Sequence, residues 1–164
     1  MPAPYPLAQV LDIKRRRVDE AEKNVKLKEE SLRKELQILE EKKAARDKVQ
    51  QHHDDKLRQL RNEMDTGTTT EKITQGKVYL KVCQEKVIIE NKKVAEQQEQ
   101  VELAERNVEV AKQELKKRRT DVDKFVNHRK DWLKDQQKEI AIQEERDEDE
   151  LGSLMHNLRK RKGY

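Results

Sequence analysis

Aliphatic residues recur at every seventh position through much of this chain, and that spacing restricts the folds open to it. From Ile73 onward, eight successive positions seven residues apart are aliphatic, although only 32% of the chain is hydrophobic. The row comprises Ile73, Leu80, Val87, Val94, Val101, Val108, Leu115 and Val122. A sustained repeat of seven places one narrow apolar stripe along a helix and predicts a left-handed coiled coil.

The other rows are less regular. Three residues after each member of the first row stands a weaker companion row of Gly76, Cys83, Glu90, Gln97, Ala104, Ala111, Arg118 and Phe125. The first part of the chain has the same period at Leu11, Val18, Val25, Leu32, Leu39 and Leu60, interrupted by Arg46 and His53. Its second row is predicted at Ala21, Leu36, Val49, Leu57 and Met64, with slips between three and four residues.

Composition supports helices and argues against a compact globular core. Charged residues make up 44% of the chain and aromatic residues 3%, which leaves either a disordered charged chain or long helices that bury a stripe. Glu, Lys, Gln, Arg, Leu and Ala dominate, and all are good helix formers. The three prolines stand at positions 2, 4 and 6, so no proline interrupts the rest of the chain.

A single turn is expected between two helices. The segment from Asp65 to Thr70 is rich in Thr and contains Gly67, which can adopt a positive φ and end a helix. Thr68 and Glu71 have the spacing of a capping box for the next helix. We therefore predict an all-α fold: one domain over residues 1–164, with helix one at about 7–65, a turn at about 66–68 and helix two at about 69–160. The short turn makes it an antiparallel coiled-coil hairpin.

The turn also fixes which residues should face each other. Paired residue numbers should sum to about 135, given the rise of a helix. Leu32 then faces the Val101 region, Leu39 faces Val94, and Leu11 faces the Val122 region. Arg46 would lie near Glu90, as a pair that sets the register.

The arms are unequal, so helix two should overhang. Residues past about 130 should have no partner helix, and the heptad should slip by four residues there, to Val126, Leu133 and Ile140. Glu29 with Arg33 and Glu30 with Lys34 are expected to support their helix as ion pairs.

Candidate catalytic and metal sites are weak. A two-helix hairpin offers no concave pocket for catalysis, and no phosphate-binding loop occurs in the sequence. His52, His53, Asp54 and Asp55 resemble a metal cluster by composition, but adjacent helical residues point about 100° apart, so a solvated face is favoured. Cys83 is expected to be a buried thiol, not a nucleophile, and a single cysteine fits a reducing compartment. We predict no enzyme activity, no cofactor and no metal site.

Charge and hydropathy bear on partners and location. The net charge of +4 comes from 38 basic and 34 acidic residues, which indicates charges interleaved along helix faces and no nucleic-acid partner. No apolar run is long enough to cross a membrane, and the first residues do not resemble a secretory signal, so a cytoplasmic protein is expected. The basic run Arg159–Lys162 suits a solvated helix end, with an acidic protein surface as the alternative. Trp132 could contact a partner or pack over Pro4, Tyr5 and Pro6.

Both ends and the turn resemble a known family. Tyr5-Pro6-Leu7, Val10-Leu11, Ile13-Lys14 and Ala21-Glu22 are similar to the start of the YscO/FliJ-type stalk proteins of type III secretion. The turn at Asp65–Thr69, the segment His128–Trp132 and the acidic, Leu-x-x-Arg-x-Arg ending resemble the chlamydial member of that family.

The resemblance implies a non-enzymatic stalk. Family members insert their paired ends into the hexameric secretion ATPase, reach towards the export gate, and also handle secretion chaperones. The implied location is cytoplasmic and peripheral to the inner-membrane export apparatus, without membrane insertion. Residues expected at the ATPase are Tyr5, Leu7, Leu11, Trp132, Leu151, Leu154, Met155, Leu158, Arg159 and Arg161. Residues expected at the export gate are Arg58, Arg61, Met64, Lys72, Lys77 and Tyr79.

Two other functions remain open from the residues alone. A generic coiled-coil scaffold would dimerise through the same apolar stripe, whereas the stalk should be a monomer. A membrane-surface protein would bind anionic lipid through basic residues, which the balanced charge disfavours.

Overall fold

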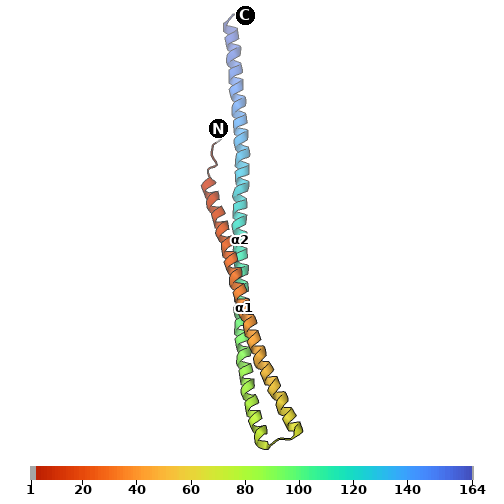
Figure 1. Cartoon of the computed structure of the whole chain (residues 1–164). Helices are drawn as coiled ribbons and strands as arrows, with labels where there is room; N and C mark the ends of the chain where they lie inside the picture. The colour runs from red at the N-terminus through yellow and green to blue at the C-terminus, as the bar shows by residue number, and fades with distance from the viewer. Residues whose placement is uncertain (1–2, 164) are drawn as a thin grey trace. The chain divides into compact units, whose positions relative to one another are not determined.

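Two long helices account for nearly all of the structure. The computed structural model describes residues 3–163, in which α1 spans Ala8–Thr66 and α2 spans Thr70–Arg161 (Figure 1). Each helix begins and ends within one residue of the predicted bounds, so the predicted all-α helical hairpin is confirmed. Residues 1, 2 and 164 of the predicted single domain lie outside the described residues. Neither helix contains, within the described part of the chain, an apolar stretch sufficient to span a bilayer.

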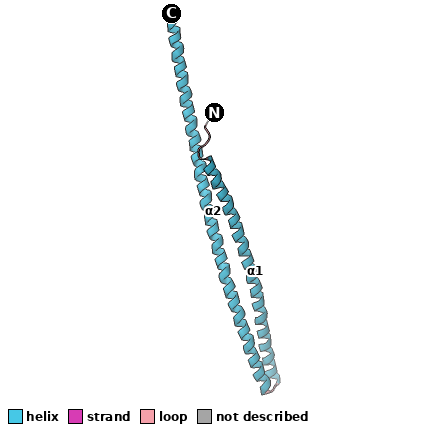
Figure 2. Cartoon of the chain, turned by 90° about the vertical axis from the view of Figure 1, so that its left-hand side faces the viewer, coloured by secondary structure: helices cyan, strands magenta, loops and turns pink. Residues whose placement is uncertain are grey.

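The chain divides into two compact units, and each contains a piece of both helices. Unit 1 comprises the residues up to Ala21 and those from Leu115 onward, and unit 2 comprises Glu22–Glu114. In both views α1 and α2 lie side by side and run in opposite directions (Figures 1 and 2). The antiparallel pairing follows from the loop at residues 67–69, which is too short for any other return.

The seam of unit 2 is carried by one aliphatic row from each helix. Val87, Val94, Val101 and Val108 of α2 are buried, as are Val25, Leu39 and Leu60 of α1. Leu39, Val94 and Val101 form one cluster, against which Leu32 packs. The predicted facing of Leu32 with Val101 and of Leu39 with Val94 is therefore confirmed.

The second row of α1 differs from the prediction. Leu36 and Met64 are 42% and 49% exposed, so neither belongs to the seam. One set of half-buried positions continues from the buried Ala21 with a strict spacing of seven: Lys28, Glu35, Lys42, Val49, Lys56 and Glu63. The aliphatic stems of Lys and Glu cover the apolar row while their charged heads reach water, so a polar residue can hold a seam position. The prediction is therefore wrong for Leu36 and Met64, whereas Ala21 is buried and Val49 and Leu57 are half-buried as expected.

Two of the predicted ion pairs are wrong and one is confirmed. Arg46 pairs with Asp47 at 3.1 Å, and Glu90 pairs with Lys93 at 3.3 Å, so the expected Arg46–Glu90 bridge does not form. Ion pairs this exposed contribute little free energy, so they do not hold a charge to one particular partner. Glu30 does pair with Lys34 at 3.8 Å, whereas Glu29 reaches across to Lys112 of α2 at 3.9 Å.

The turn lies where the sequence predicts it, with both of its ends one residue later. Gly67 has a φ of 96°, the left-handed conformation expected of a residue that ends a helix. The hydroxyl of Thr69, not that of Thr68, accepts the Lys72 amide at 3.4 Å, and the carbonyl of Thr69 accepts the Ile73 amide at 3.2 Å. Thr69 is thus the N-cap, and the predicted capping box between Thr68 and Glu71 is wrong. Sequence spacing could not distinguish three consecutive threonines.

Unit 1 pairs the first turns of α1 with the middle of α2. Leu11, Ala21 and Leu115 are buried there, and Lys14 contacts Asp121 at 3.9 Å. The predicted slip in the heptad does not continue as a buried row, because Val126 is half-buried but Leu133 and Ile140 are exposed. Burial continues in the original frame through Phe125 and Trp132, which are half-buried. The N-terminal segment, through Tyr5, covers this part of α2. It thereby lengthens the seam in its original frame.

Candidate functional site

The N-terminal segment ahead of α1 is held on α2 by one aromatic side chain. Tyr5 is buried, and its hydroxyl shares a hydrogen bond of 2.6 Å with Nδ1 of His128. The Tyr5 ring also meets the edge of Trp132, with ring centroids 5.5 Å apart. Of the two alternatives open for Trp132, packing against the Pro4–Pro6 segment is therefore the one observed. Tyr5 and Trp132 therefore cover part of each other's apolar surface within unit 1.

Beyond this cluster, α2 runs on without packing. Every described residue from 137 to 163 is exposed. In Figure 1 this last stretch of α2 extends past the N-terminal segment. This unpacked helix is rich in charged residues, and local side-chain pairs such as Gln143 with Asp147 at 2.9 Å support it in water. It is available to a partner along its whole surface.

The tip of α2 has an apolar face. Leu151, Leu154, Met155 and Leu158 are between 51% and 60% exposed, and their spacing of three and four residues puts them on one side of the helix. We call these four residues the tip stripe. Arg159, Lys160 and Arg161 form the last turn, where positive charge complements the helix dipole. A solvated apolar stripe beside cations is typical of a surface that another protein covers.

The other candidate surface surrounds the turn in unit 2. His52 shares a hydrogen bond of 2.7 Å with the Tyr79 hydroxyl, and the Lys56 ammonium lies 6.0 Å from the Tyr79 ring centroid. The loss of water around Tyr79 raises its pKa above the ordinary value, and the nearby Cys83 adds to the rise. Tyr79 thus stays a neutral phenol, and its ring contacts side chains of α1 while 43% of its surface remains exposed.

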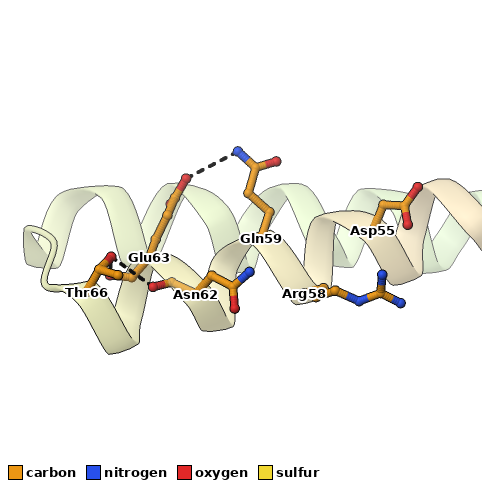
Figure 3. Close-up of a pocket in the computed structure, with 6 residues that line it drawn as sticks. All are labelled: Asp55, Arg58, Gln59, Asn62, Glu63 and Thr66. Carbon is orange, nitrogen blue, oxygen red and sulfur yellow. Dashed lines mark hydrogen bonds between the residues drawn. The ribbon is translucent and has the colours of Figure 1, made fainter.

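One face of α1 beside the turn is polar throughout. Asp55, Arg58, Gln59, Asn62, Glu63 and Thr66 line a shallow depression (Figure 3). Gln59 donates to Glu63 at 3.2 Å, and the Thr66 hydroxyl donates to the Asn62 carbonyl at 2.9 Å. All six side chains come from one helix, and the two hydrogen bonds run along it. The depression therefore offers polar contacts to a protein surface and does not enclose a small molecule.

The histidines and acidic residues do not converge. His53 contacts Asp54 at 3.2 Å, while His52 turns to Tyr79 and Asp55 accepts from Gln51 at 2.9 Å. The hydrogen bond from His53, followed by the one from Gln50, lowers the pKa of Asp54. No group of three or more potential metal ligands occurs within residues 3–163.

The predicted contact residues fall into two groups. The candidates for the ATPase include the exposed tip stripe with Arg159 and Arg161, but also the buried Tyr5 and Leu11 and the half-buried Leu7 and Trp132. The latter four hold unit 1 together, so they can orient the free end of α2 but offer little surface. The candidates for the export gate are all exposed: Arg58, Arg61, Met64, Lys72, Lys77 and Tyr79.

Sequence reasoning missed the cluster of His52, Lys56 and Tyr79. The signal for it lies in the register, because His52 and Tyr79 each stand one position before a member of the main seam row, His53 and Leu80. Residues at that position flank an antiparallel seam on the same side and meet across it.

The comparison with known proteins agrees with this architecture. The sequence profile of the YscO-like protein family matches residues 2–162. CT670 from Chlamydia trachomatis, solved as a candidate YscO homolog, is 44% identical, with a TM-score of 0.94 over 97% of this chain and 98% of that chain. No curated protein sequence matches significantly.

Proposed function

This chain belongs to the YscO-like family of type III secretion proteins, and on that premise we propose that it is a non-enzymatic stalk of the secretion machine. In this proposal the free end of α2 enters the hexameric secretion ATPase. The turn end faces the export gate. The protein would then work in the cytoplasm, beside the inner-membrane export apparatus, and transmit the state of the ATPase to the gate.

The observation that carries the proposal is the tip stripe. Four large apolar side chains remain exposed near the end of α2, where no other described segment packs against the helix. Burying each of them fully would contribute about 1.5–3 kcal/mol, so a partner that covers all four would gain several kcal/mol. A narrow helix is also the shape that enters a channel between subunits, which a broad globular surface could not do.

The turn end supports a second contact of another kind. Arg58, Arg61, Lys72 and Lys77 are exposed there, next to Met64 and Tyr79. Cations around a few apolar contacts suit an acidic protein surface, where they would speed association and set orientation. The same exposed faces could receive secretion chaperones, which the family handles.

The central experiment mixes this protein with the secretion ATPase of the same organism. We expect the full chain to raise the rate of ATP hydrolysis and a chain ending before Leu151 to lose that effect. A finer variant replaces Leu151, Leu154 and Leu158 together by Gln, which retains the helix and removes the apolar face. We expect it to behave as the truncated chain does.

Ile142→Gln is the matched control. Ile142 is 50% exposed, and it stands nine residues before Leu151, which places it on the opposite side of α2. It should leave stimulation unchanged. If the full chain neither binds the ATPase nor changes its rate, the stalk proposal fails. A scaffold protein would give that result.

A further inference from the structure

The strongest unexplained feature is a second aliphatic row on α2, outside the seam. Val82, Ile89, Leu103 and Val110 are 41–65% exposed and keep the spacing of seven, with Glu96 at the middle position. We call these five residues the outer row. Each lies two positions after a residue of the main seam row, which is buried in every case except the half-buried Leu80, so the outer row is turned away from α1 by more than a right angle. Apolar residues at a spacing of seven fit another helix.

The outer row is symmetric about Glu96. Val82 and Val110 stand at equal distances on either side of it, as do Ile89 and Leu103. Two copies of this helix can therefore lie antiparallel across a two-fold axis at Glu96. Val82 of one copy would then meet Val110 of the other, and Ile89 would meet Leu103. Such self-complementarity is what a two-fold interface requires.

The neighbouring charges have nearly the same symmetry, displaced by half a residue from Glu96. Glu85, Lys92, Glu99 and Arg106 form an exposed row that alternates in sign beside the outer row. In the antiparallel arrangement Glu85 lies opposite Arg106, and Lys92 lies opposite Glu99. A parallel arrangement would place each charge against its own copy, which is repulsive. None of the four makes an ion pair within the described residues, so all remain available.

We propose that the outer row of unit 2 is a docking surface for a second copy of this chain, joined antiparallel about Glu96. The internal seam shows that one aliphatic row per helix can be the main contact between two helices, although on α2 the buried Cys83, Ala104 and Ala111 add to it. That seam is helped by the tether of the turn, whereas two separate chains have no such help. The interface is also small, which makes the dimer weak and reversible. A monomer, as expected from the sequence, is then the dilute form.

Glu96 limits the strength of this dimer. At the two-fold axis the two Glu96 carboxylates approach each other, and like charges at the centre of an interface oppose association. Glu96→Leu removes that repulsion and completes the aliphatic row. We expect it to tighten dimerisation at least tenfold, while the helix content stays unchanged.

The first test is sedimentation equilibrium of the full chain over a range of concentrations up to near millimolar. The natural chain should show a reversible approach to twice the monomer mass, and Ile89→Lys should abolish it. Leu27→Lys is the matched control, because Leu27 is exposed to a similar degree on α1, outside the outer row. A Glu96→Leu chain that stays monomeric throughout would overturn the proposal, as would association that Ile89→Lys leaves intact.

The second test addresses the antiparallel register. Glu85→Lys places two cations opposite each other and should weaken the Glu96→Leu dimer severalfold. Adding Arg106→Glu reverses the charge opposite position 85 and should restore the strength of the dimer. Without that restoration the register proposed here is wrong. These measurements contain no ATPase, so their outcome is independent of the stalk proposal.

Discussion

At the scale of single residues, the polar positions of the seam carry the most information. Gln97 is 5% exposed, and it is the buried polar residue within the described chain. Its side-chain amide donates to the Glu35 backbone carbonyl at 3.0 Å and also to the Glu35 carboxylate. Burying the Gln97 amide without hydrogen bonds would destabilise the fold. Both contacts form in one register of α1 against α2, so Gln97 favours that register.

Gln97→Ala should therefore lower the free energy of unfolding by about 1–2 kcal/mol, because the apolar seam loses both the hydrogen bonds and the packing of the side-chain stem. Chemical denaturation followed by circular dichroism measures the loss. Gln98→Ala is the control, since Gln98 is exposed and should change stability by only a few tenths of a kcal/mol. Equal effects of the two substitutions would show that the Gln97 contacts contribute nothing.

At the scale of elements, each end of a helix depends on a particular local contact. The turn is closed by Gly67 and Thr69, and α1 approaches α2 closely just beyond it. A Cβ on Gly76 would lie 2.8 Å from Cδ1 of Leu60, so any larger residue at this companion-row position would require the Leu60 side chain to move. The N-terminal segment depends on Tyr5 in the same local way.

Thr69→Ala should lower the free energy of unfolding by about 1 kcal/mol, because the Lys72 amide loses the hydroxyl that accepts it. Thr68→Ala should have a smaller effect, since its neighbour is the observed cap. Thermal or chemical unfolding of both variants against the natural chain decides between them. The reverse order of effects would mean that α2 begins at the residue indicated by sequence spacing.

Tyr5→Ala should expose Trp132, the only tryptophan of the chain. We expect its fluorescence to move to longer wavelength and to become more accessible to a soluble quencher, because the ring contact worth about 0.5–1.5 kcal/mol is lost. Tyr5→Phe should keep the packing and lose only the hydrogen bond to His128. Tyr79→Phe, in unit 2, should leave the emission unchanged. A Trp132 emission spectrum that is unchanged in Tyr5→Ala would contradict the observed packing.

At the scale of the whole molecule, apolar burial is distributed unevenly. The described buried residues all lie between positions 5 and 115, and every described residue after 136 is exposed. Helices without tertiary packing are cooperative only weakly and open from their ends. The same chain thus combines a stable paired region with a free helix that a partner can order.

Native-state hydrogen exchange should reveal this difference. Amides between Val87 and Leu115 should exchange orders of magnitude more slowly than those from residue 137 to Arg161. A chain that ends at Gln136 should keep the protection of the paired region, which serves as the control. Equal protection in both regions of the isolated protein would show that the end of α2 is stabilised by a contact absent from this structure.

The sequence by itself determined the elements and their direction. The repeat of seven from Ile73 to Val122 predicted the seam, and Gly67 among threonines predicted the turn, because both are local properties of the chain. The pairing of Leu39 with Val94 followed from the turn and the constant rise of a helix. The candidate surfaces were partly visible for the same reason, since the spacing of Leu151, Leu154, Met155 and Leu158 already defines one helix face.

Only the tertiary structure decided which side chains complete those surfaces. Hydrophobicity selected Leu36 and Met64 for the second row of α1, whereas half-buried Lys and Glu fill it, because a long stem can cover a seam and still keep its charge in water. Whether Trp132 was free or covered depended on Tyr5, more than a hundred residues away in sequence. The outer row could be recognised only after the seam was known. A residue of α2 faces outward only by comparison with the neighbouring residues that pack against α1.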